Sequence, residues 1–275
     1  MSATIAEKPG KVLIYRHTVL IRITHWINVV AITFLVMSGL QIFNARPDLY
    51  WGNQSDFEHP ILSLTAEDTA NGDQIGQTKI FGWTFNTTGF LGLSYTDGDP
   101  EERGFPWWMT VPSYHDLATG RRWHFFFAWV FAINGFVYLI ASLLSRHVWR
   151  DLLPTREQIR NIGPTIWHHM KLKFPHERDY NVLQKLIYLI MIFAVLPLIV
   201  LAGLVMSPGM DAAFPWLVDL FGGRQTARTI HFICATLIVL FVIVHVLLVI
   251  LSGVWNNIRS MISGKYSIDS EAPHG

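Results

Sequence analysis

Four long stretches of the sequence are almost entirely apolar, and they alternate with segments in which polar residues are frequent. They cover residues 22–43, 121–145, 183–206 and 228–252. A helix needs roughly 20 apolar residues to cross about 30 Å of hydrocarbon, so each stretch is long enough to span a bilayer. The pattern predicts an all-α integral membrane protein, with residues 1–275 forming a single domain built on a bundle of four transmembrane helices.

The connection between the first two predicted helices, residues 44–120, is a long polar insertion. Loops of this length are usually functional, which favours a docking surface for a partner protein over a cap without a partner. Its residues Trp83, Trp107 and Trp108 are expected near the membrane surface, where tryptophan is enriched. Both ends of the chain are polar and are expected to be disordered, and the N-terminus shows no removable signal peptide.

Composition supports the membrane prediction and excludes several other classes. The chain is 51% hydrophobic and only 15% charged, whereas soluble domains carry nearer a quarter charged residues. A net charge of +1 leaves no basic surplus for binding nucleic acid. The single cysteine, Cys234, excludes an intrachain disulfide and an iron–sulfur cluster, and the lack of a CxxCH motif excludes covalently attached haem. Cys234 lies in an apolar stretch and is interpreted as a packing residue.

Basic residues predict the orientation of the chain. Four of them precede or begin the first span and eight lie between residues 146 and 185, whereas the 44–120 insertion has eleven acidic residues against three basic ones. The positive-inside rule then places both termini and the second connection in the cytoplasm. The expected location is the bacterial inner (plasma) membrane, with the lipid bilayer around the helices and the insertion in the periplasm.

Histidines within the apolar stretches are the main candidates for chemistry. Four of the twelve lie there: His25, His124, His231 and His245. Ionisable residues at such depth are costly and mark function by default. His231 and His245 are fourteen residues apart on one helix, which separates them by about 21 Å and places them within roughly 40° of the same face. His25 is then level with His245, and His124 is level with His231.

Two histidine pairs at two depths predict two haems, each with its iron bound by two imidazoles from facing helices. The alternative is that each buried histidine hydrogen-bonds a neighbour or belongs to a proton path. Zinc is disfavoured, because three or four donors do not converge at one level.

Two glycines fit the same geometry. Gly39 lies fourteen residues beyond His25, and Gly135 lies eleven beyond His124, so each shares nearly the same helix face as its histidine. Because glycine leaves the helix surface bare, both are candidates for packing against a flat macrocycle. Their alternative role is to let helices approach closely.

Arginines stand just before two of the histidines. Arg22 precedes His25 by three residues, while Arg121 and Arg122 precede His124 by three and two. A guanidinium can form paired hydrogen bonds with a haem propionate. The alternative is that these side chains only extend to the membrane surface at the ends of spans.

Short motifs around these residues resemble one protein family. They are residues 22–26 (RITHW) and 121–124 (RRWH), together with the histidine spacing of the last span. The set resembles the dihaem cytochrome b subunits of membrane-bound hydrogenases, formate dehydrogenases and thiosulfate reductases. Residues 38–43 (SGLQIF), 50–52 (YWG) and 201–208 (LAGLVMSP) are most similar to the thiosulfate reductase branch.

The resemblance implies two haems b, with His25 and His245 as iron ligands of an inner haem and His124 and His231 of an outer one. Members of the thiosulfate reductase branch often accompany a molybdopterin oxidoreductase, which implies a periplasmic catalytic or electron-transfer subunit as partner. The long insertion departs from the hydrogenase and formate branches, so their docking residues cannot be transferred.

The resemblance also implies a quinone, either menaquinone or ubiquinone, near the inner haem. Residues 180–185 (YNVLQK) are similar to an Asn-x-x-Gln-Lys stretch that lines this site in formate dehydrogenase membrane subunits. Asn181, Gln184 and Lys185 are therefore the candidate quinone residues. The alternative is a polar start of the third span that merely ends a loop.

The predicted function is electron transfer between the quinone pool and a periplasmic oxidoreductase subunit, in a direction that the sequence leaves open. Two other functions compete with it. One is a haem-containing membrane anchor without a quinone site of its own. The other is a transporter of protons or solutes lined by histidines.

Overall fold

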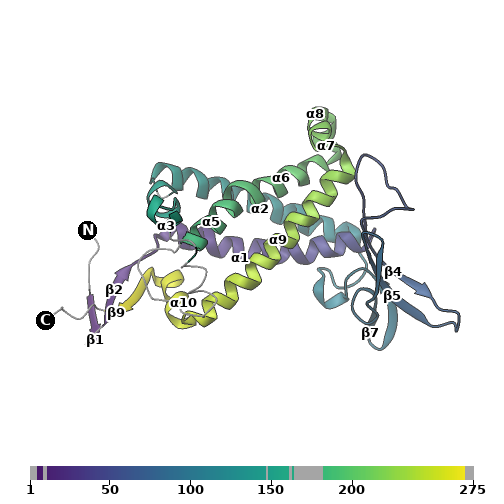
Figure 1. Ribbon diagram of the computed structural model, residues 1–275, viewed down its shortest axis with the longest axis horizontal. Coiled ribbons are helices and arrows are strands. Elements are labelled where there is room, and N and C mark those ends of the chain that lie inside the picture. The colour runs from purple at the N-terminus through teal and green to yellow at the C-terminus, as the bar shows by residue number, and fades with distance from the viewer. Residues whose placement is uncertain (1–4, 9–10, 147, 161–162, 164–181, 270–275) are drawn as a thin grey trace. The chain divides into compact units, whose positions relative to one another are not determined.

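A computed structural model describes residues 5–8, 11–146, 148–160, 163 and 182–269. Within these residues, four helices are long and apolar enough to cross a membrane, which confirms the predicted fold class (Figure 1). They are α1 (Val19–Asn44), α2 (Leu117–Leu144), the segment Val182–Val205 and α9 (Arg224–Leu251). The first two begin three and four residues earlier than predicted, at Val19 and Leu117.

The third span contains a change in helix type. It consists of α5 (Val182–Ile190), a π-helical segment (Met191–Val195) and α6 (Leu196–Val205). Pro197 is the second residue of α6 and has no backbone N–H to donate to the preceding turn. A π-helical segment next to such a residue is a common way to accommodate the missing hydrogen bond within a membrane helix.

The chain forms two compact units. The first contains Met1–Asn28, Ile133–Leu196 and Ile238–Gly275, and the second contains Val29–Ala132 and Pro197–Leu237. Each long helix therefore contributes one end to each unit. The 44–120 insertion lies wholly in the second unit.

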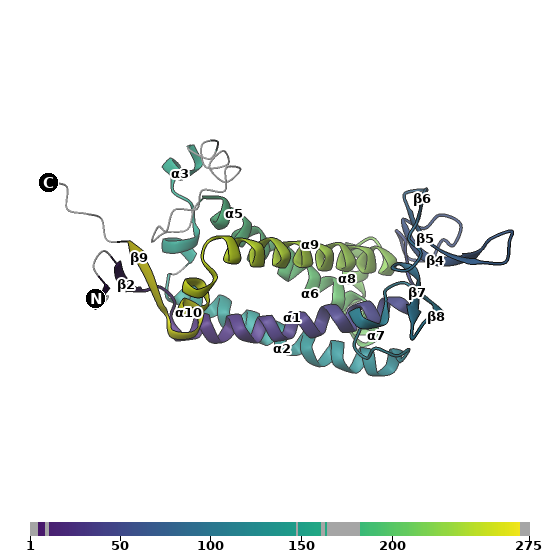
Figure 2. The ribbon, with the colours of Figure 1, turned by 90° about the horizontal axis from the view of Figure 1, so that it is seen from below.

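The insertion is built from strands, which the sequence analysis did not predict (Figure 2). One antiparallel sheet has the order β3 (Asp48–Leu49), β4 (Leu62–Asp68), β5 (Gln74–Ile80) and β6 (Trp83–Asn86). A separate hairpin pairs β7 (Gly92–Thr96) with β8 (Asp99–Arg103), and a 3-10 turn follows at Trp107–Met109. Leu49 and Leu64 from the sheet pack with Phe43 at the end of α1, so the core of the insertion continues into the helices.

Hydrogen bonds fasten the insertion to the helix ends. The Asn44 side chain, at the end of α1, accepts from the Phe105 amide (2.7 Å) and donates to the Phe105 carbonyl (3.1 Å). The carbonyl of Gly52 accepts from the Gln225 and Thr226 amides in the first turn of α9. These contacts satisfy backbone groups that helix ends and loops otherwise leave unpaired.

Besides the helix ends, the described part of the first unit contains strands and short helical segments. Strands β1 (Ile5–Lys8), β2 (Lys11–Tyr15) and β9 (Lys265–Asp269) form one antiparallel sheet, and α10 (Val254–Ser263) follows α9. Two further helical segments, Val148–Leu152 (η2) and α3 (Arg156–Arg160), belong to the second connection. The prediction that both chain ends are disordered is wrong for β2 and β9, because the two ends order each other by pairing.

Candidate functional site: two histidine pairs

One histidine pair lies in the first unit. His25 on α1 and His245 on α9 face each other, with their ring centroids 6.4 Å apart and the rings tilted by 57°. Nδ1 of His25 is buried and has no hydrogen-bond partner among the described residues. The structure thus brings together the two histidines that the sequence placed at one level.

The other pair lies in the second unit. His124 on α2 and His231 on α9 have ring centroids 6.1 Å apart, and their rings are inclined by 60°. As in the first pair, the two imidazoles come from different helices. No other histidine of the described residues is paired in this way.

These separations fit a metal ion bound between two imidazoles. Two metal–nitrogen bonds of about 2 Å, together with two ring radii of roughly 1 Å, give a centroid separation of about 6 Å. No group of three or more histidine, cysteine or carboxylate side chains suited to a metal occurs within the described part of the chain. The donor sets therefore suit a haem iron, which needs two axial ligands, and not a zinc ion, which needs three or four.

In the second pair, Nδ1 of each ring is hydrogen-bonded to a neighbouring helix. Nδ1 of His231 lies 2.9 Å from the Ile199 carbonyl oxygen, which can only accept, so Nδ1 carries the proton. The Ser38 hydroxyl donates to the Phe34 carbonyl (2.5 Å), and its oxygen accepts from Nδ1 of His124 (3.1 Å). In both rings Nε2 is then the unprotonated nitrogen, as metal ligation through Nε2 requires.

Two glycines lie against these imidazole rings and leave space for them. A Cβ on Gly39 of α1 would lie 3.3 Å from Cε1 of His124, and a Cβ on Gly203 of α6 would lie 3.3 Å from Cε1 of His231. Gly39 thus contacts a histidine, whereas a Cβ on Gly135 would meet nothing within 4 Å. Gly203 was missed because α6 carries no histidine from which spacing could be counted.

The arginines occupy different environments. Arg22 is partly buried and donates from Nη1 to the Ile262 carbonyl of α10, while its Nε is buried without a hydrogen-bond partner among the described residues. Arg121 and Arg122 are exposed, and the Arg121 guanidinium lies 5.6 Å from the centroid of the Phe125 ring.

Arg228 was missed by the sequence analysis. It precedes His231 by three residues, which is the spacing of Arg22 to His25 and of Arg121 to His124. Its guanidinium donates to the Arg46 carbonyl and lies 5.4 Å from the centroid of the Phe43 ring. The shared Arg-x-x-His spacing was the signal that could have found it.

The candidate quinone residues lie at the start of the third span. Lys185 on α5 is buried, with 5% of its surface exposed, whereas Asn181 lies outside the described residues. Tyr188, one turn beyond Gln184, meets the ring of Phe241 edge to face at 6.2 Å. Phe241 in turn stacks on His245 at 5.8 Å, so α5 connects to the His25–His245 pair through aromatic contacts.

Comparison with known proteins identifies the family of the chain. The family model described as prokaryotic cytochrome b561 matches residues 16–264. A protein of Azospira oryzae, provisionally named protein-methionine-sulfoxide reductase subunit YedZ1, is 30% identical over 237 residues, covering 86% of this chain and 90% of the relative. No solved structure matches the chain. The chain belongs to the prokaryotic cytochrome b561 family, and is thus a multi-pass membrane subunit that transfers electrons and binds haem b.

Proposed function

We propose that the chain binds two haems b and transfers electrons between membrane quinone and a catalytic subunit in the periplasm. The observation that carries this proposal is the pair of bis-histidine arrangements, with centroid separations of 6.4 and 6.1 Å. His25 and His245 would hold one haem, and His124 and His231 the other. A haem iron bound by two imidazoles carries one electron at a time, and its potential depends on burial and on hydrogen bonds around the ligands.

The residues around the second pair have roles that follow from their contacts. The Ile199 carbonyl and the Ser38 hydroxyl fix the orientation of the imidazoles and increase the electron density on Nε2. Gly39 and Gly203 leave room for the rings at the helix surface. Gly135 keeps its predicted role of packing against a macrocycle, and the open space around it supports that role.

Propionates are the proposed partners of the arginines. Arg22, Arg121 and Arg122 keep this role, and Arg228 joins them because of its matching distance from His231 along the helix. The buried Nε of Arg22 supports the assignment, since a buried donor without a partner is costly.

A quinone, either menaquinone or ubiquinone, is the proposed redox substrate near the His25–His245 pair. Asn181 and Gln184 would hold its carbonyl oxygens by hydrogen bonds, and the buried ammonium of Lys185 would donate to one of them. Oxidation of a quinol releases two electrons and two protons, and quinone reduction consumes them. Tyr188 and Phe241, which join α5 to His245, support this placement.

The partner is proposed to dock on the 44–120 insertion. By the positive-inside rule this acidic segment lies in the periplasm of a bacterial inner membrane, with both termini in the cytoplasm. The Azospira oryzae relative is named as a subunit of a sulfoxide reductase, which supports a catalytic partner, here of molybdopterin type as the sequence resemblance implies. Strand β6 is an exposed sheet edge bearing Trp83 and Phe85, which are 74% and 52% exposed, and such edges pair readily with other proteins.

The haem content of the purified protein tests the proposal. We expect two haems b per chain and reduction of both by a quinol analogue. His245→Ala should lose one haem and all quinol-linked reduction, while His124→Ala should lose the other haem and keep reduction of the first. A single haem in the unmodified protein, or two haems in His245→Ala, would contradict the proposed pairing. Two haems that a quinol analogue does not reduce would indicate a haem-containing anchor instead.

A further inference from the structure

Residues 103–111 run along α1 toward the interior of the span. The Phe105 amide donates to Asn44 (2.7 Å), Arg103 donates to the side chain of Gln41 (3.1 Å), and the Val111 amide donates to the Met37 carbonyl (3.2 Å). Positions 44, 41 and 37 are three and four residues apart and so share one face of the helix. The segment therefore follows α1 for two helical turns instead of leaving from its end.

This path places non-helical backbone at membrane depth. Met37 lies seven residues before Asn44, which is about 10 Å along the helix axis. The 26 residues of α1 extend about 39 Å, which exceeds the roughly 30 Å of hydrocarbon by about 5 Å at each end. If α1 extends equally beyond both surfaces of the hydrocarbon, Asn44 lies about 5 Å outside it. The contact between Val111 and Met37, about 10 Å further along the helix, then lies about 5 Å inside the hydrocarbon.

The segment has the composition of a lipid-facing one. No charged residue occurs between Arg103 and Asp116. Trp107 and Trp108 are 40% and 57% exposed, and the Trp108 ring lies 6.2 Å from that of Phe90. In α1 no residue from Phe34 to Asn44 is exposed, although many of the preceding helix residues are. The segment thus packs on a part of α1 that carries no exposed residue.

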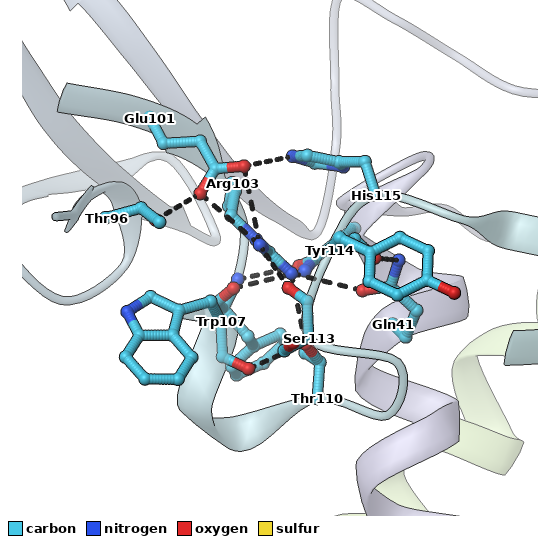
Figure 3. A network of polar contacts seen from close by, with 11 residues as sticks. Gln41, Thr96, Glu101, Arg103, Trp107, Thr110, Ser113, Tyr114 and His115 are labelled. Carbon is cyan, nitrogen blue, oxygen red and sulfur yellow. Dashed lines mark hydrogen bonds and ion pairs between the residues drawn. The ribbon is translucent and has the colours of Figure 1, made fainter. Parts of the chain in front are cut away.

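Several of its polar groups are hydrogen-bonded within the protein (Figure 3), although Nε of Arg103 has no partner among the described residues. Arg103, whose side chain is 1% exposed, donates to the Ser113 carbonyl (2.7 Å) and the Thr110 hydroxyl (3.0 Å). Gln41 donates to the Tyr114 carbonyl (2.9 Å), and Glu101 lies 3.3 Å from the guanidinium as its counter-ion. Irregular backbone is tolerated at this depth only where the protein supplies its hydrogen bonds.

We propose that residues 104–113 form a re-entrant segment that enters the bilayer beside α1 and presents Trp107 and Trp108 to lipid. Arg103 anchors it from the membrane surface, and Gln41 anchors it from the helix. The proposal requires only that α1 spans the membrane, and it does not depend on the number of haems or on the quinone site. On this proposal Trp107 and Trp108 contact lipid, whereas Trp83 lies in the edge strand β6 of the sheet.

Site-directed spin labelling of the full chain in liposomes tests the proposal. Cys234→Ser removes the only native thiol, after which Trp108→Cys and the matched control Trp83→Cys are labelled separately. We expect the label at 108 to collide preferentially with oxygen, which concentrates in hydrocarbon, and the label at 83 to collide with a water-soluble nickel chelate. A membrane-impermeant maleimide should react roughly ten times more slowly at 108 than at 83, because water is scarce at that depth. Equal access of the nickel chelate to both positions would overturn the proposal.

An unlabelled measurement covers the case in which a cysteine variant does not fold. Brominated lipids quench tryptophans that contact acyl chains, so Trp108→Phe should remove part of the quenching, whereas Trp83→Phe should remove none. If Trp108→Phe leaves the quenching of the intact chain unchanged, the residue contacts no lipid and the proposal is wrong. If residues 104–113 were instead a docking surface exposed to water, Trp108→Phe would leave the quenching unchanged and the nickel chelate would reach position 108 freely.

Discussion

The guanidinium of Arg103 is buried, and both of its terminal nitrogens are hydrogen-bonded, whereas Nε has no partner among the described residues. Its two terminal nitrogens reach Gln41, Thr110, the Ser113 carbonyl and Glu101, all within 3.4 Å. By contrast, the pair of Lys79 and Glu67 joins side chains that are 38% and 45% exposed. Burial therefore distinguishes two ion pairs of the same insertion, and the energetic consequence of removing each cation should differ.

We expect Arg103→Ala to lower the free energy of unfolding by about 3–5 kcal/mol, because it leaves a carboxylate and several acceptors without their donor. Lys79→Ala should change it by less than about 1 kcal/mol, as for other exposed pairs. Thermal unfolding of the two variants in the same detergent measures the contrast. Equal effects would mean that the Arg103 network does not hold the insertion in place.

The carboxyl group of Glu101 gives this network a dependence on pH. Burial by itself raises its pKa, but the Thr96 hydroxyl, the Arg103 guanidinium and the His115 imidazole more than compensate, and the pKa lies below the ordinary 4.5. A lowered pKa stabilises the folded state above about pH 4.5, and this stabilisation is lost as the pH falls through the folded-state value. We expect the difference in melting temperature between the unmodified chain and Glu101→Gln to shrink below pH 4.5. A difference that is constant from pH 7 to 3 would contradict the contribution of this charge.

At the scale of elements, the helices were predictable and the strands were not. Long apolar stretches indicate spans because hydrocarbon tolerates little else, and all four predicted spans are present. The strands of the insertion are short and its sheet is partly exposed, so no run of alternating apolar residues stands out. Pairing of β2 with β9 joins residues about 250 positions apart, and this kind of long-range contact leaves no local pattern.

The candidate site was predictable where spacing along a helix was enough. His231 and His245 share α9, so their separation followed from helix geometry, and the partners of each lie opposite. Gly203 and Ser38 contact the imidazoles from helices that bear no matching histidine at that level. Such residues are identified by packing in three dimensions and not by sequence spacing.

The contacts of Gly39 and Gly203 with the imidazoles lead to a prediction about packing between helices. Gly39→Ala and Gly203→Ala would each place a methyl group 3.3 Å from an imidazole carbon, and we expect a loss of stability of about 1–3 kcal/mol from overpacking. In the haem-free protein Gly135→Ala is the matched control, because its methyl group would meet no protein atom within 4 Å. Thermal unfolding and the visible absorption spectrum measure both effects. If Gly135 packs against a macrocycle, Gly135→Ala should destabilise only the haem-containing protein, whereas open surroundings predict no loss.

At the scale of the whole molecule, the proposed electron route connects groups that the chain places at both ends of α9. His245 has aromatic contacts toward α5, where Lys185 is buried. His231 lies two residues beyond Thr229, whose hydroxyl donates to the Tyr50 carbonyl of the insertion (2.6 Å). A quinone site at one end and a docking surface at the other would make the long helix the scaffold of the route. Chemical reductants bypass the quinone site, which allows the two ends to be tested separately.

We expect Lys185→Met to slow reduction of the protein by a quinol analogue at least about tenfold, since a buried ammonium that donates to a substrate oxygen contributes about 1.5–3 kcal/mol. Dithionite should still reduce the same haems to the same extent, because it requires no quinone site. Stopped-flow absorption in the visible range measures both rates, and Arg156→Met, in the second connection but outside the third span, controls for loss of a positive charge. A variant in which both reductants slow together would indicate damage to the haem site, and one in which neither slows would remove Lys185 from the quinone site.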